Sequence, residues 1–134
     1  LRWNGFWKDG RVDRRVLDRA GEAYRQAGPG VVKIAVTHHP FVAHDAKHAG
    51  DIVRNGDQVL KRLAEAGVGL AIAGHLHRAY QKMTPAGVLS AQAGSACSTR
   101  LRGEPNSYNV ITINGGRYDV CTRTFNGQAF VDET

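Results

Sequence analysis

Two apolar runs that end on histidines set the architecture of this chain: VVKIAVTHHP at residues 31–40 and VGLAIAGHLH at residues 68–77. Each run is short and apolar, which is typical of a buried strand. The segment between them predicts a helix, with Asp51 as its cap and an end near Gly67, because apolar residues recur there at helical spacing. A strand, a helix and a strand in this order predict two adjacent parallel strands. Both histidine groups then lie at the carboxyl ends of these strands, where open α/β sheets bind ligands.

The flanking segments add one helix and several further strands. Apolar residues spaced by three and four predict a helix over residues 12–27. Beyond Arg78 we expect strands over residues 88–96, 108–114, 118–125 and 129–131, with hairpin signals at Asn-Gly-Gly 114–116 and Asn-Gly 126–127. The sequence therefore predicts an α/β fold in which a βαβ unit is followed by an antiparallel meander. We expect one unit over residues 1–134, with a change of layer near Arg78.

The composition narrows the classes of partner and compartment. A net charge of +6 is of the kind that nucleic-acid-binding domains carry. However, the arginines of residues 11–19 alternate with aspartates, as on a solvated helix face, and no RNA-recognition or zinc-finger motif is present, so nucleic acid is disfavoured. Cys97 and Cys121 lack metal-type spacing and suit a reducing compartment. Without a signal peptide or an apolar run near about 18 residues, we expect a cytoplasmic protein with no membrane partner.

The histidines after the two strands have the chemistry of metal ligands. Neutral imidazole binds Zn, Fe and Mn well. Gly74 lets the backbone bend sharply before the second group, and Pro40 stiffens the turn after the first. We therefore predict a metal site with His38, His75 and His77 as its ligands.

The motifs THHP at residues 37–40 and GHLH at residues 74–77 resemble the last two motifs of the calcineurin-like metallophosphoesterases. The resemblance covers most of the chain and implies the carboxy-terminal half of a four-layer α/β/β/α sandwich. It also implies two divalent metal ions (Mn, Fe or Zn), with His38 and His75 on one ion and His77 on the other. Such a pair of ions activates water and stabilises the charge of an in-line displacement, so the implied activity is phosphate-ester hydrolysis, as a phosphodiesterase or phosphatase.

The opening motifs of that family are absent from this sequence. Neither Asp-x-His nor Gly-Asn-His-Asp/Glu occurs, and Gly50-Asp51 and Gly56-Asp57 are poor substitutes for its Gly-Asp. We therefore expect a partial domain that lacks the amino-terminal metal motifs, binds the two ions incompletely and is inactive alone. The missing amino-terminal half of the same enzyme is then its expected partner. Without that half, strand edges and an apolar face lie open, so we also expect self-association.

The remaining site predictions concern the substrate, a phosphate ester and in one version a nucleotide. His39 is not a ligand in the family pattern, and we expect it to support the loop or contact the substrate, which makes it the candidate catalytic residue. Further substrate contacts are expected from the loop after Pro40 and from two arginines suited to phosphate: Phe41, His44, His48, Arg100 and Arg102. Two alternative interpretations stay open, a non-catalytic binding module that keeps the fold and a basic nucleic-acid-binding domain.

Overall fold

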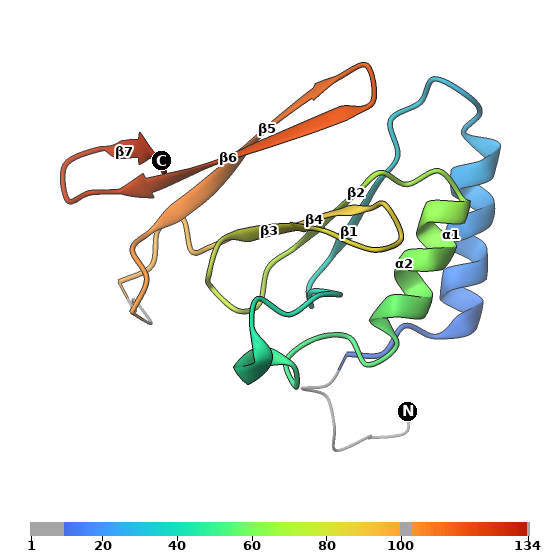
Figure 1. The fold of residues 1–134 in the computed structure, drawn as a ribbon, viewed down its shortest axis with the longest axis horizontal. Coiled ribbons are helices and arrows are strands. Elements are labelled where there is room, and N and C mark those ends of the chain that lie inside the picture. Colours follow the sequence, from blue (N-terminus) through green and yellow to red (C-terminus); the bar gives the residue numbers. More distant parts are fainter. Residues whose placement is uncertain (1–9, 100–102, 134) are drawn as a thin grey trace.

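The computed structural model describes residues 10–99 and 103–133, which form two helices and two sheets (Figure 1). The helical elements are α1 (Arg14–Gln26), the 3-10 turn η1 (Ala46–His48) and α2 (Gly56–Glu65). The first sheet contains β1 (Ile34–Thr37), β2 (Leu70–Ala73), β3 (Tyr80–Met83) and β4 (Leu89–Gln92). The second sheet contains β5 (Ser107–Asn114), β6 (Arg117–Phe125) and β7 (Phe130–Asp132). The predicted mixed α/β class is confirmed.

The first sheet has the strand order β1-β2-β4-β3. Strands β1, β2 and β4 are parallel, and β3 is antiparallel to β4. The predicted parallel pairing of the two histidine-bearing strands is confirmed, and its register sets Thr37 opposite Ala73. Because these strands end level with each other, the chain segments that carry the two histidine groups leave the sheet side by side.

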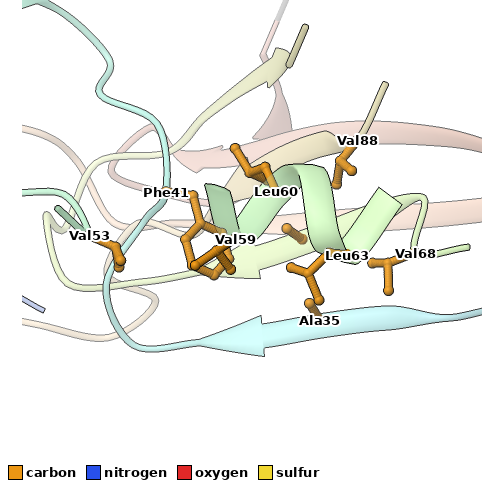
Figure 2. Packing of buried hydrophobic residues seen from close by; sticks show 9 residues of the cluster. Ala35, Phe41, Val53, Val59, Leu60, Leu63, Val68 and Val88 are labelled. Carbon is orange, nitrogen blue, oxygen red and sulfur yellow. The ribbon is translucent and has the colours of Figure 1, made fainter. Parts of the chain in front are cut away.

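Two apolar cores join three layers. The helices pack on one face of the first sheet through a core that includes Ala35, Val59, Leu63 and Val88 (Figure 2). The second sheet covers the other face, where Leu70, Leu89 and Ala91 meet side chains of β5 and β6. Full burial of a valine or leucine side chain stabilises the folded chain by about 1.5–3 kcal/mol, so these contacts contribute strongly to the placement of the strands. The described residues thus form an α/β/β arrangement.

The structure corrects the predicted meander. Strand β3 was not expected, and β4 joins the first sheet in parallel with β2, so the antiparallel meander comprises β5, β6 and β7 alone. The change of layer accordingly falls between Gln92 and Ser107, and not near Arg78. The hairpin at Gly115 and Gly116 is confirmed, since both glycines adopt the positive φ that a tight β5–β6 turn requires.

The second helix begins later than its apolar spacing predicts. Its first residue is Gly56, and Asp51 is part of the preceding loop instead of a cap. The backbone N–H groups of Val53 and Arg54 are donated to the carbonyls of Pro40 and Gly10, and these tertiary bonds hold the segment out of the helix. Neither helix, nor any other helix among the described residues, has the length and apolar character needed to cross a membrane.

Strand β1 lies at an edge of the first sheet. Its residue Val36 is 75% exposed although its neighbour Ala35 is buried in the helix-side core. An apolar residue on an unpaired edge is a contact surface for another strand or chain. The expected self-association therefore stays a prediction, with Val36 as the residue through which we expect it.

Candidate metal centre

The candidate metal centre lies at the carboxyl edge of the parallel strands. His38 and His39 follow β1 directly, and His75 follows β2 after Gly74. The two segments are joined by a hydrogen bond in which the backbone N–H of Gly74 is donated to the carbonyl of His38, with an N–O distance of 3.2 Å. Strand pairing thus carries into the loops and brings histidines from distant parts of the sequence together.

Three imidazoles gather here, and we call His38, His39 and His75 the histidine trio. One ligand nitrogen from each residue can be chosen so that all three lie within 4.8 Å of one another. The Nε2 of His38 and the Nδ1 of His75 are 3.2 Å apart, and the rings of His39 and His75 have centroids 4.2 Å apart. Two nitrogens on one tetrahedral ion, each about 2.0–2.1 Å from it, lie about 3.3 Å apart.

The donor set therefore suits a single ion. Three imidazoles with an open fourth position form a pattern used by catalytic zinc sites. Across residues 10–99 and 103–133, the histidine trio is the one group of three or more His, Cys, Asp or Glu side chains close enough to hold an ion. The trio lacks a carboxylate, so a bridged pair of ions needs ligands in addition to these three.

Backbone strain marks the second histidine segment. His75 has φ of 78° and His77 has φ of 57°, which places both non-glycine residues in the left-handed region. Such conformations cost free energy and persist where surrounding contacts impose them, most often at functional sites. The first segment is held differently, by a hydrogen bond of 2.9 Å from the Thr37 hydroxyl to the His39 carbonyl.

Burial and neighbouring charge favour the ligand form of His75. Its pKa is lowered from the ordinary value of 6.5, first by burial and then by repulsion from the imidazoles of His39 and His38. The nearby Asp51 carboxylate acts in the opposite direction. A lowered pKa keeps the imidazole neutral, which is the form that binds a metal ion.

Metal binding should consequently depend on pH. We expect the affinity for Co²⁺ or Zn²⁺ to fall as the pH is lowered from about 7 to about 5, because protons compete for the imidazole nitrogens. The lowered pKa of His75 delays its own protonation to a pH below 6.5. Competition with a chromophoric chelator at several pH values measures the affinity. An affinity that stays constant between about pH 7 and about pH 5 would show that histidines are not the ligands.

His77 is placed apart from the histidine trio. Its Nδ1 is 2.7 Å from the hydroxyl oxygen of Ser95, and this hydrogen bond leaves Nε2 as the remaining ring nitrogen. The assignment of His77 to a different ion from His38 and His75 stays a prediction. His39, expected to support the loop or contact the substrate, has its ring beside those of His38 and His75. The sequence signal for it was present in the HHP triplet of residues 38–40, but a neighbouring pair does not show whether both rings turn to the same point.

A cavity of about 420 Å³ adjoins the site, and we call it the histidine cavity. It is lined by four histidines, four other polar side chains and one leucine: His44, His48, Asp51, His75, Leu76, His77, Arg78, Tyr80 and Glu104. Asp51 was not predicted as a site residue, because its position before an apolar helical pattern suggested a helix cap. Arg78 and Glu104 form an ion pair in which Nε and Oε1 are 3.1 Å apart.

The residues expected to contact substrate lie in different parts of the structure. His44 and His48 line the histidine cavity, and both rings contact Asp45. The prediction for Phe41 needs correction, since its side chain is 3% exposed and packs in the helix-side core (Figure 2). The Phe41 ring after the HHP turn is therefore part of the apolar core and not of the substrate site. Arg100 and Arg102 lie outside the described residues.

Comparison with known proteins finds a structural likeness but no sequence match. No family model matches the chain, and no curated protein sequence matches it. Among solved structures, the chain is similar to Vps29 from Entamoeba histolytica, crystallised in complex with Zn²⁺, at 20% identity and a TM-score of 0.48. The match covers 73% of this chain and 50% of that one, so this chain spans about half of its length. The chain is therefore described by its own structure, as a two-sheet α/β protein with a histidine-rich candidate metal centre.

Proposed function

We propose that this chain carries the histidine side of a metal-dependent phosphoesterase centre. The observation that supports the proposal most is the histidine trio, whose ligand nitrogens lie within 4.8 Å of one another at the carboxyl edge of parallel strands. The THHP and GHLH motifs, at residues 37–40 and 74–77, support the reaction class through their resemblance to metallophosphoesterases. Phosphate-ester hydrolysis is the chemistry that a metal ion beside an open cavity serves well.

The histidine trio, His77 and the histidine cavity each have a role in this proposal. His38, His39 and His75 would hold one ion, which when bound supplies Lewis acidity and lowers the pKa of water. His77, whose Nδ1 contacts the Ser95 hydroxyl, has Nε2 free of that contact and would be a ligand of a second ion. The histidine cavity receives the ester. The neutral form of His75, favoured by its lowered pKa, keeps the trio competent at neutral pH.

Hydrolysis of bis-p-nitrophenyl phosphate tests the proposal. We expect the protein, expressed from its complete gene, to hydrolyse this ester only with Mn²⁺ or Zn²⁺ present. His77→Ala should reduce turnover to background. Ser95→Ala should reduce it by about 10- to 100-fold, the usual cost of losing a residue that orients a metal-binding histidine. Ser95→Thr keeps the hydroxyl and should keep most of the activity.

The contrary outcomes separate the alternatives. Turnover that survives both chelation and His77→Ala would contradict a metal-dependent reaction. Metal binding that requires His75, without turnover of any phosphate ester, would favour the non-catalytic binding module. Tight, salt-sensitive DNA binding without metal would favour the nucleic-acid interpretation.

A further inference from the structure

A carboxylate–imidazole pair stands beside the histidine cavity, outside the histidine trio. Asp45 Oδ1 lies 2.7 Å from Nδ1 of His48, while its Oδ2 lies 3.3 Å from Nδ1 of His44. Oδ1 also accepts the backbone N–H groups of Lys47 and His48, at 3.0 Å and 3.2 Å. Asp45 is thus fixed at the start of η1 and holds the His48 ring by a short contact.

The hydrogen bond determines which nitrogen of His48 faces outward. The contact with His48 is the largest of the causes that lower the pKa of Asp45 to about 2, so the carboxyl group is ionised at neutral pH. An ionised carboxylate only accepts hydrogen bonds, and Nδ1 of His48 must therefore carry the proton. The remaining nitrogen, Nε2, belongs to a ring that lines the same cavity as His75 and His77.

The loop that carries the pair is anchored to the sheet. The hydroxyl of Tyr80, in β3, is donated to the carbonyl of Val42. Burial raises the pKa of Tyr80 to about 12, so the phenol stays neutral and keeps this bond. The ring of His44 packs edge-on against Tyr80, with centroids 5.4 Å apart. These two contacts with Tyr80 tie the loop that carries the Asp45–His48 pair to β3.

We propose that the Asp45–His48 pair delivers the proton to the leaving oxygen of the phosphate ester. This inference rests on the proposed function. A water oxygen bonds to phosphorus, the bond from phosphorus to the leaving oxygen breaks, and its electron pair stays on that oxygen. The Nε2 proton of the His48 imidazolium moves to the same oxygen, which leaves as an alcohol. The attacking water releases one proton to solvent, and the neutral imidazole takes one back. Asp45 stabilises the charged ring, as carboxylates do for catalytic histidines.

The leaving group distinguishes this role from a merely structural one. A poor leaving group such as phenolate needs a proton as the bond breaks, whereas p-nitrophenolate leaves readily without one. Methyl phenyl phosphate and methyl p-nitrophenyl phosphate differ in that group alone. With the full-length metal-loaded protein, His48→Gln should slow hydrolysis of the phenyl ester by about 100-fold and that of the nitrophenyl ester by less than about 3-fold.

Two further variants complete the experiment. Asp45→Asn should also slow hydrolysis of the phenyl ester more than that of the nitrophenyl ester, but by a smaller factor. If His48→Gln does not fold, Asp45→Asn tests the proton-donor role in its place. His44→Gln is the matched control, because His44 contacts the other Asp45 oxygen and its side chain is 33% exposed against 34% for His48. His44→Gln should change the rates of hydrolysis of the two esters by the same factor. Zn²⁺ affinity, measured in parallel, should be the same in all three variants.

The possible failures are separable. Equal losses on both esters, or no loss in His48→Gln, would overturn the proton-donor role while the wild-type turnover upholds the proposed function. Weaker Zn²⁺ binding in His48→Gln, with both esters slowed alike, would assign the pair a structural role. No turnover by the wild-type protein would overturn the proposed function and this inference together.

Discussion

Replacing His75 with alanine is expected to weaken Zn²⁺ binding by more than about 100-fold, which exceeds the loss usually caused by residues behind the ligands. His75 contacts both other members of the histidine trio, with a nitrogen 3.2 Å from His38 and a ring centroid 4.2 Å from His39. Without its imidazole, two donors remain, and these hold an ion far less firmly than three. Competition against a chromophoric zinc chelator at neutral pH measures the change.

The neighbouring histidines supply the controls for this experiment. His44→Ala removes a ring from the same cavity but from outside the histidine trio, and it should leave Zn²⁺ affinity unchanged. His39→Ala should weaken Zn²⁺ binding to the histidine trio as His75→Ala does. The metallophosphoesterase motif pattern, by contrast, assigns His39 no ligand role. Equal Zn²⁺ affinity in His75→Ala and His44→Ala would remove the trio from consideration as a metal site.

Replacing Gly56 with alanine is expected to destabilise the protein by about 1–3 kcal/mol, the usual cost of inserting a methyl group into a packed interior. A Cβ at Gly56 would lie 2.6 Å from the carbonyl oxygen of Phe41 and 3.3 Å from its Cα. These are backbone atoms of the loop that follows the HHP turn, so neither side can relax by a rotamer change. Urea denaturation followed by far-ultraviolet circular dichroism measures the free energy of unfolding.

A second glycine provides the matched control. Gly21 is also buried in a helix, but a Cβ there meets only the Arg25 guanidinium, at 3.4 Å and 4.0 Å. A flexible side chain can move away, and alanine is the better helix former by about 0.5–1 kcal/mol, so Gly21→Ala should stabilise the protein. If Gly56→Ala stabilised it as well, the close packing of α2 on the HHP loop would be wrong.

The part of the fold predicted from sequence is the part with strong local signals. The runs that became β1 and β2 are short and apolar, and the segment between them has helical apolar spacing, so a parallel pair followed from known connection rules. The Asn-Gly-Gly signal placed the β5–β6 hairpin for an equally local reason. These features depend on neighbouring residues and are visible in the sequence.

The errors arose where tertiary contacts override local pattern. Strand β3 reads Tyr-Gln-Lys-Met and lies at a sheet edge with three of its four residues exposed, so it has no apolar run to reveal it. The start of α2 was misplaced because Val53 and Arg54 bond to backbone carbonyls of Pro40 and Gly10. Bonds between segments so far apart leave no periodic trace in the sequence.

The candidate site likewise has features that the sequence predicted and features that it did not. Histidines at the ends of two parallel strands were expected to meet, and His38 and His75 do so. The inclusion of His39 depends on ring orientation in a turn, which residue types alone do not specify. Phe41 was expected to contact the substrate because it lies in the loop after Pro40, but the packing of α2 on that loop buries its side chain. The charge and size of a side chain predict which interactions it is able to make, whereas its packing in the fold determines which of them it makes.

X-ray absorption spectroscopy of the Zn²⁺-loaded protein tests the central claim most directly, because it reports the atoms bound to the ion. We expect a first shell with three imidazole nitrogens at about 2.0–2.1 Å and one further light atom, and a loss of one imidazole in His39→Ala. A shell of oxygens without imidazole scattering, or sulfur at about 2.3 Å from a cysteine, would contradict a metal centre built on His38, His39 and His75.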